Sequence, residues 1–279
     1  MMKIRNKEFD FDYMTYVMGI LNVTPDSFSD GGLHNKEDEA VAHALKMIEE
    51  GAAIIDIGGE STRPGFERVT EEEELRRVIP VIRSLRKVSD IPISIDTTKP
   101  NVAAAAIEAG ADIINTVEGV DAPCEMIEVV KSTGAPFIMT YEKGYADIFE
   151  DELIKMAKAA EEAGIDSDKI IVDPGIGFGK TQEENLKIIN VLPMITRIPY
   201  PVLLGCSRKS VIGNVLNVPV SERLPGTIVT TVLACLAKVG IVRVHDVSEN
   251  VNALKMMRAI IETEDEVRAE RNKNGSYNN

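Results

Sequence analysis

Short apolar segments alternate with helix-like segments along almost the whole chain, and this alternation restricts the fold more than any other feature. The apolar segments are rich in Ile and Val and mostly apolar at every position, as expected for parallel strands covered on both faces. They lie at residues 16–20, 53–57, 91–95, 112–115, 136–140, 169–173, 202–205 and 241–244. Eight strand–helix units predict a (β/α)8 TIM barrel of the α/β class, with an open doubly wound sheet as the alternative.

The segments between the predicted strands carry helix-end signals. Thr70 and Glu73 have the spacing of a capping box, which opens a helix. A glycine directly follows the predicted helices 103–109, 153–163 and 223–239, at the position where a helix commonly stops. These signals place helices between the strands and so favour the barrel.

The chain reads as a single domain, because no segment has the composition of an interdomain linker. We expect the barrel to occupy residues 1–261 and the tail 262–279, which is charged and then rich in Asn, to fray. The first 14 residues lack the apolar core of a signal peptide, and the most apolar stretch, 227–244, is interrupted by Lys238 and Gly240. The sequence therefore predicts neither a leader nor a membrane partner.

The charge balance is acidic and limits the partners. The chain has 31 Lys and Arg against 45 Asp and Glu, a net charge of −14. Such a surface argues against nucleic-acid binding, and an anionic substrate would need a local basic cluster. The cysteines Cys124, Cys206 and Cys235 lie far apart, as expected for reduced thiols in a cytoplasmic protein.

Polar residues follow nearly every predicted strand, and in a barrel the chemistry lies at the carboxyl ends of the strands. They are Asn22, Asp56, Asp96, Asn115, Asp173, Ser207 with Lys209, and Arg243 with His245. One polar residue at a strand end is ordinary, but so many converging on one rim indicate an active site.

The residue types suggest what this rim binds. Asp96, Asn115 and Asp173 provide hydrogen-bond acceptors that suit the N–H edge of a flat heterocycle. Lys209 and Arg243 are cations at neighbouring positions, and arginine stacks readily on aromatic faces. Asp56 lies within an apolar strand, where a structural role is at least as plausible as ligand contact.

A phosphate group could bind between Arg63, Arg243 and His245, assisted by the helix that begins after the last strand. The longest loops, 22–35 and 58–69, are rich in turn residues and are expected to be lids. The glycine-rich segment 173–181 is not a Walker phosphate loop, because Pro174 stands where that motif needs glycine.

The longest motifs resemble those of a known family. Met18–Gly32 (MGILNVTPDSFSDGG) and Asp56–Gly65 (DIGGESTRPG) are similar to the two signatures of the dihydropteroate synthases. The series continues in order with Ile93–Lys99, Asp173–Lys180, Gly205–Lys209 and Arg243–Val247, so that the resemblance covers about residues 16–260.

The resemblance implies a (β/α)8 barrel that joins 4-aminobenzoate to 6-hydroxymethyl-7,8-dihydropterin pyrophosphate in folate synthesis. It implies a pterin site made of Asp96, Asn115, Asp173, Lys209 and a stacking Arg243, with Asp96, Lys209 and Arg243 as the catalytic residues. Asn22 would bind Mg²⁺ beside the pyrophosphate, near Arg63, Arg243 and His245. Phe28, Thr62, Pro64, Phe178, Ser207 and Lys209 would line the aminobenzoate site, where sulfonamides would compete. The family also implies a homodimer.

Two positions depart from the family pattern. Thr116 follows Asn115 where many members have Asp, and Thr140 follows Met139 where many have His. Two other functions therefore stay open from the sequence: a methyltetrahydrofolate-dependent corrinoid methyltransferase and a catalytically inactive pterin-binding protein.

Overall fold

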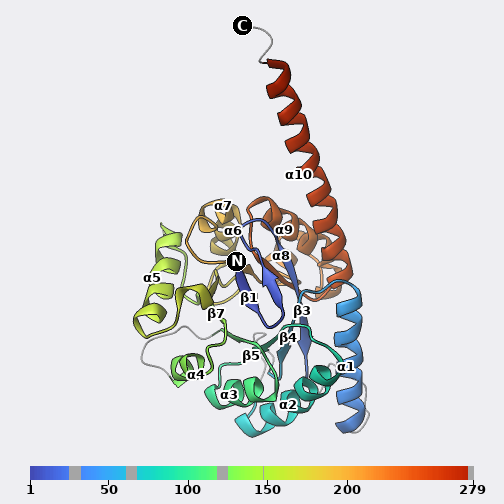
Figure 1. The fold of residues 1–279 in the computed structure, drawn as a ribbon, viewed down its shortest axis with the longest axis vertical. Coiled ribbons are helices and arrows are strands. Elements are labelled where there is room, and N and C mark those ends of the chain that lie inside the picture. The colour runs from blue at the N-terminus through green and yellow to red at the C-terminus, as the bar shows by residue number, and fades with distance from the viewer. Residues whose placement is uncertain (25–32, 61–67, 118–124, 147, 276–279) are drawn as a thin grey trace.

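A ring of eight parallel strands forms the centre of the computed structural model, which describes residues 1–24, 33–60, 68–117, 125–146 and 148–275 (Figure 1). The strands are β3 (Tyr16–Asn22), β4 (Ile54–Gly58), β5 (Ile93–Asp96), β6 (Ile113–Thr116), β7 (Phe137–Thr140), β8 (Ile170–Asp173), β9 (Leu203–Leu204) and β10 (Ile241–Val244). They pair in the order β8-β7-β6-β5-β4-β3-β10-β9. An isolated parallel bridge between Val172 and Val202 brings β8 beside β9 and nearly closes the ring. The predicted barrel is confirmed.

Helices surround this ring and connect its strands (Figure 1). They are α1 (Leu33–Glu49), α2 (Glu71–Val88), α3 (Pro100–Ala109), α4 (Glu125–Thr133), α5 (Phe149–Glu162), α6 (Gln182–Asn190), α7 (Leu192–Ile195), α8 (Ser210–Leu216), α9 (Leu224–Leu236) and α10 (Val247–Gly275), with short 3-10 turns at Ser167–Lys169 and Val220–Glu222. Helix α10 extends away from the barrel and passes residue 261 without a break. Fraying of the tail 262–279 stays a prediction.

Side chains point alternately outward and inward along each strand, and this divides the barrel core into two apolar clusters. Outward-facing residues such as Ile55, Ile95 and Val172 pack against the helices in one large apolar cluster. Inward-facing residues near the amino ends of the strands, such as Ile54 and Ile171, form a second apolar cluster inside the ring. The residues one pleat further along each strand also face inward, so the polar strand-end residues share the barrel interior.

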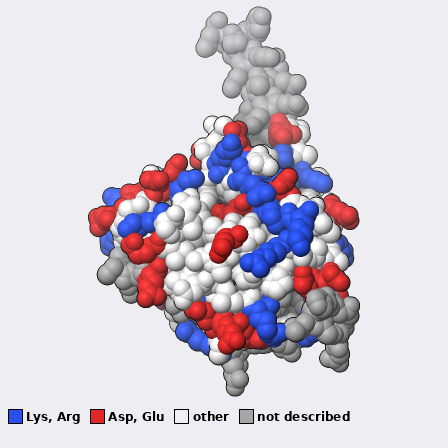
Figure 2. Space-filling view, turned by 60° about the horizontal axis from the view of Figure 1, so that its bottom comes forward, with Lys and Arg blue, Asp and Glu red and all other residues white. Residues whose placement is uncertain are grey.

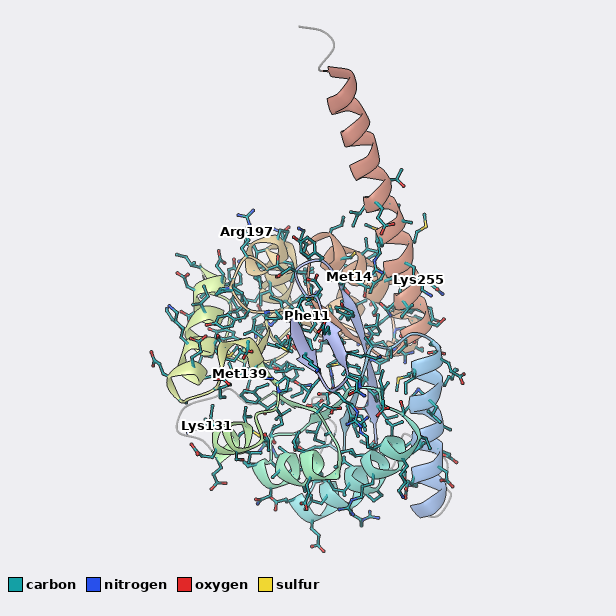
Figure 3. All side chains as sticks on the ribbon, viewed as in Figure 1. Phe11, Met14, Lys131, Met139, Arg197 and Lys255 are labelled. Carbon is teal, nitrogen blue, oxygen red and sulfur yellow. The ribbon has the colours of Figure 1, made fainter. Side chains whose placement is uncertain are left out.

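A hairpin that the sequence did not reveal closes the amino end of the barrel. Strands β1 (Met2–Ile4) and β2 (Lys7–Phe9) pair antiparallel. Ile4 and Phe9 are each 1% exposed and belong to the inner apolar cluster. Phe11 joins the same cluster and is labelled near the centre of the ring in Figure 3. The polar site can therefore open only at the carboxyl ends of the strands.

Several helix ends differ from the predictions: α3 begins at Pro100 and α5 at Phe149, earlier than the predicted 103 and 153. Helix α9 ends at Leu236 rather than at Val239, and Lys238 takes the left-handed backbone (φ 61°) that was expected at Gly240. Thr70 caps α2, accepting from the Glu73 N–H at 3.3 Å, but the Glu73 carboxylate binds two arginines of the helix, Arg76 and Arg77. These changes leave the strands and the site in place.

The charged residues of the surface are mixed in sign. On the face drawn in Figure 2, acidic and basic side chains are interspersed around a broad uncharged area. Within the described part of the chain, no helix combines the length and apolar character needed to cross a membrane.

Candidate active site

A polar layer lies inside the barrel, directly above the inner apolar cluster. Parallel pairing sets Asp96 beside Asn115, and Thr140 beside Asp173. Asp56, Asp96, Asn115 and Asp173 are all at most 8% exposed. The strand register thus collects acceptor groups from neighbouring strands at one end of the barrel, as predicted.

Arg243 of β10 crosses this layer and links its carboxylates. Its Nε contacts Asp56 Oδ2 at 2.5 Å, and its Nη2 contacts Asp96 Oδ2 at 2.5 Å. Asn115 Nδ2 donates to both Asp56 oxygens, at 3.4 and 3.3 Å. Asp56 is fully buried and holds Arg243 and Asn115, so the structural role that the sequence left open is present.

Asp173 is held by the glycine-rich segment that follows it. Its Oδ1 accepts from the Gly175 N–H at 2.8 Å. Gly175 has a φ of +72°, and a Cβ there would lie 2.0 Å from the Tyr141 carbonyl oxygen. Lys180 ties the other end of the segment to the same Tyr141 oxygen at 2.6 Å. Glycine is required because the backbone lies directly against the end of β7.

Lys209 comes from the segment after β9 and spans the mouth of the barrel. Its Nζ donates to the Ile176 carbonyl oxygen and lies 4.3 Å from the centre of the Phe178 ring. This is a cation–π contact between Lys209, which the sequence assigned to both substrates, and Phe178, which it assigned to the aminobenzoate site.

The described residues assigned to the anion and its metal lie around one pocket of about 240 Å³. Asn22, Arg243 and His245 line it together with Ser207 and Phe178. Ser207 Oγ lies 3.0 Å from His245 Nδ1 and accepts from the His245 backbone N–H at 3.2 Å. The pocket therefore combines cations, a hydroxyl group and an aromatic wall.

Burial shifts the ionisation of the polar layer. Burial raises the pKa of Asp96 to about 7, against the opposing effect of Arg243, and raises the pKa of Asp173 as well. Burial lowers the pKa of Lys209 and brings that of Lys180 to about 8. Burial would also lower the pKa of Arg243, but Asp56 and Asp96 raise it overall. Clustered shifts of this kind are typical of functional sites.

A partly buried ion-pair cluster that the sequence did not reveal adjoins Asp96. Lys99 Nζ contacts Glu60 Oε2 at 2.5 Å and Glu74 Oε2 at 2.6 Å. Glu74 is fully buried, and its Oε1 has no hydrogen-bond partner among the described residues. Glu60 also accepts from the Val69 N–H at 3.3 Å. Through Glu60, this cluster contacts both described parts of the second long loop, residues 58–69.

A larger cavity of about 520 Å³ lies away from this layer, near the amino ends of the strands. Phe11, Arg197, Tyr200 and Lys238 are among its lining residues. It has none of the strand-end acceptors, and chemistry in barrels occurs at the opposite end. We therefore assign the active site to the smaller pocket.

The structure brings together most of the residues that the sequence singled out. They are Asn22, Asp96, Asn115, Asp173, Phe178, Ser207, Lys209, Arg243 and His245. Phe28, Thr62, Arg63 and Pro64 lie outside the described residues, and their roles stay predictions. The sequence missed Lys99 and Glu74, although Lys99 closes the third motif and could have drawn attention there.

Comparison with known proteins gives a consistent result. Residues 18–245 match the pterin binding enzyme family. The chain is 49% identical over 267 residues to the dihydropteroate synthase of Clostridium beijerinckii, covering 93% of this chain and 99% of that protein. The Clostridium difficile dihydropteroate synthase structure determined in the presence of pteroic acid has a TM-score of 0.85 and 47% identity, covering 91% of this chain and 99% of that one. The Xanthomonas albilineans dihydropteroate synthase structure with 4-aminobenzoic acid has a TM-score of 0.83 and 42% identity, covering 88% and 93%.

Proposed function

Because the chain belongs to the dihydropteroate synthase family of pterin-binding enzymes, we propose that its polar barrel end condenses 6-hydroxymethyl-7,8-dihydropterin pyrophosphate with 4-aminobenzoate. The products are 7,8-dihydropteroate and pyrophosphate, and the enzyme is a transferase of folate biosynthesis. The match to a synthase, 49% identical and covering 93% of this chain and 99% of that protein, weighs against the corrinoid methyltransferase alternative.

The observation that carries this proposal is the layer of buried acceptors beside two cations. Asp96, Asn115 and Asp173 present acceptors from three strands within a water-poor interior, which suits the N–H edge of the pterin. Lys209, poised over Phe178, would contact the pterin from the mouth. Rings that lack this N–H edge would be rejected, because they would leave the buried acceptors of the protein unpaired, which is costly.

The pyrophosphate would bind in the pocket between Arg243 and His245, with Arg63 as a further cation. Mg²⁺ usually keeps several waters and takes one or two protein oxygens together with substrate phosphates. Asn22 lines the same pocket as Arg243 and His245, and its amide oxygen fits that pattern. Mg²⁺ held there would supply positive charge to the leaving group.

The reaction replaces one bond at the pterin methylene carbon. The bond from this carbon to the pyrophosphate oxygen breaks, and the aminobenzoate nitrogen bonds to the carbon and loses a proton to solvent. Asp96 and Asp173 would stabilise positive charge that spreads into the pterin ring, while Arg243 and His245 would stabilise the departing anion. The arylamine needs little activation, so fixing both reactants in place would supply much of the rate.

The aminobenzoate would bind at the mouth of the barrel. Phe178 and Ser207 line the pocket there with Lys209, and Phe28, Thr62 and Pro64 would complete the site. Sulfonamides resemble aminobenzoate in shape and would compete for this position.

We also propose that the enzyme is a homodimer formed through α9 and α10, which pack against each other. Val229, Leu233 and Leu236 recur along one face of α9 and are 59%, 42% and 57% exposed, and Met256 on α10 is 63% exposed. Exposed apolar surface of this kind marks association sites. Leu233→Glu should yield monomers in sedimentation, whereas Leu186→Glu on α6, also an exposed leucine, should stay dimeric.

The proposed location is the cytoplasm. Cys206 is a buried free thiol and Cys235 is a partly buried one, and such thiols persist in reducing compartments.

The test of the function is pyrophosphate release by the purified chain. Release should require the pterin pyrophosphate, 4-aminobenzoate and Mg²⁺ together, and dihydropteroate should form in equal amount. A chain that binds the pterin pyrophosphate but releases nothing would instead be an inactive pterin-binding protein.

A further inference from the structure

Arg208 has a backbone conformation that costs free energy. Its φ is +56°, in the left-handed region that non-glycine residues seldom adopt. The other described non-glycine residues with positive φ lie in the hairpin turn (Arg5), at the end of α8 (Asn217) and just after α9 (Lys238). Arg208 alone among them lies at the carboxyl end of the barrel, between two residues of the proposed site. Strain at such a position persists only where the surroundings enforce it.

Hydrogen bonds hold both the backbone and the side chain of Arg208 in place. Its N–H donates to Thr227 Oγ1 at 3.0 Å, and its carbonyl oxygen accepts from Arg223 Nη1 at 2.9 Å. Its guanidinium binds Asp246 through both ends, with Nε 2.9 Å from Oδ2 and Nη2 close to Oδ1. Two parallel contacts of this kind fix orientation as well as distance.

Asp246 is itself fixed. Its carbonyl oxygen accepts from Asn250 Nδ2 at 2.6 Å, and Asn250 is fully buried. Asn250 Oδ1 in turn accepts from the Thr231 hydroxyl at 2.6 Å. The carboxylate that receives Arg208 is therefore anchored on α10 and α9.

The ion pair joins the two segments that carry the cations of the site. Arg208 lies between Ser207 and Lys209, and Asp246 directly follows His245. The pair is 35% and 13% exposed. Arg208 lines the pocket beside Ser207 and His245, but its guanidinium Nε and Nη2 are bound to Asp246.

We propose that Arg208 and Asp246 are positioning residues that set the distance between Lys209 and His245. Their role is to hold neighbouring groups, because the guanidinium Nε and Nη2 of Arg208 are already bound to Asp246. The ion pair holds the strained turn at Arg208, and this keeps Ser207 and Lys209 in position opposite the His245 side chain. This inference rests on the proposed function, in which Lys209 contacts the pterin ring and His245 contacts the pyrophosphate of the same substrate.

The experiment compares Arg208→Met, Asp246→Asn and the double variant with Asp112→Asn. Asp112 is the matched control, because it accepts from Arg86 Nη2 at 2.6 Å and from the Ile93 N–H at 2.9 Å at the far end of the barrel. Each single pair variant should lower kcat by about 10- to 100-fold, and the double variant should lose no more than the worse single one. Asp112→Asn should lower Tm and leave kcat near that of the parent enzyme.

A conservative variant and a spectroscopic measurement complete the test. Arg208→Lys keeps one contact and should recover part of kcat. The NMR signals of the His245 ring should move in both pair variants and stay in Asp112→Asn, whether or not the enzyme turns over. A folded Asp246→Asn variant with parental kcat and unmoved His245 signals would overturn the proposal, as would losses that multiply in the double variant. Absence of pyrophosphate release by the parent enzyme would instead count against the proposed function.

Discussion

The guanidinium of Arg243 contacts the carboxylate of Asp96 at 2.5 Å, although the two residues are 147 positions apart in the sequence. Burial raises the pKa of Asp96 to about 7 even against this cation. A carboxyl group whose proton is held so tightly in the folded protein links folding to pH.

The first prediction is a pH-dependent stability that belongs to Asp96. The folded-state pKa, about 7, lies above the ordinary value of 3.8, so the folded protein binds the proton more tightly than the unfolded chain. The contribution of Asp96 is therefore fully present below about pH 4 and is lost as pH rises toward 7. Urea unfolding at several pH values should show the stability of the parent falling relative to Asp96→Asn across this range. If the difference in unfolding free energy between the parent and Asp96→Asn stays constant with pH, the raised pKa does not belong to Asp96.

The second prediction concerns pterin affinity. Asp173→Asn keeps the shape of the side chain but can place an N–H₂ donor where the pterin and Gly175 both present N–H groups. The loss should be about 2–4 kcal/mol of binding free energy. Calorimetry with the pterin pyrophosphate measures it, and Asp151→Asn on the exposed face of α5 is the control. Equal affinities for parent and Asp173→Asn would remove Asp173 from the site.

The third prediction uses two glycines with similar backbone angles. Gly175 and Gly134 have φ of +72° and +64°, but a Cβ would meet the Tyr141 carbonyl at 2.0 Å in the first and nothing within 4 Å in the second. Gly134→Ala should cost about 1 kcal/mol of unfolding free energy from the backbone angle. Gly175→Ala adds a backbone clash and should cost at least about 3 kcal/mol and displace Asp173. Similar unfolding midpoints for the two variants would mean that the glycine-rich segment 173–181 moves to accommodate the added methyl group.

The fourth prediction concerns the ion pairs of Lys99 with Glu60 and the buried Glu74. Lys99→Met leaves the carboxylate of the fully buried Glu74 without its cation, which should cost about 3–5 kcal/mol. Adding Glu74→Gln removes the unpaired charge, so the double variant should recover much of the lost stability. Arg76→Met breaks an exposed pair on the same helix and should change the unfolding free energy by less than about 1 kcal/mol. If the double variant is no more stable than Lys99→Met, Glu74 is not the source of the cost.

The fifth prediction concerns the metal. Turnover should stop in excess chelator and resume with added Mg²⁺, because charge accumulates on the pyrophosphate as its bond breaks. Asn22→Ala should raise the Mg²⁺ concentration needed for half-maximal rate. An unchanged requirement in this variant would place the metal on other ligands.

The strands could be predicted because their pattern is local. Each is a short apolar run, and the polar residue that follows Ile95 or Val172 continues the inward face of the same strand. Once eight strands are assigned, the barrel topology alone brings Asp96 and Asp173 to one end. The shared rim was therefore accessible from sequence.

The contacts between distant segments could not be predicted, because no periodic pattern marks them. Lys99 and Glu74 pair across α2 and the segment after β5, and Arg243 reaches Asp56 across 187 positions. The hairpin of residues 2–9 is formed by strands of only three residues each, too short for alternation to show. Gly240 is explained by this hairpin region rather than by a helix end, because a Cβ there would lie 2.9 Å from Phe11 Cδ1.

The hairpin that closes the amino end of the barrel also constrains the kinetics. With that end filled by Ile4 and Phe9, both reactants must enter through one opening, and the reactant that lies nearer the mouth obstructs the one that lies deeper. If the pterin occupies the layer around Asp173 and aminobenzoate the region of Phe178, aminobenzoate bound first blocks the route to the deeper position. High aminobenzoate concentrations should then slow the reaction by substrate inhibition, and raising the pterin pyrophosphate concentration should relieve it.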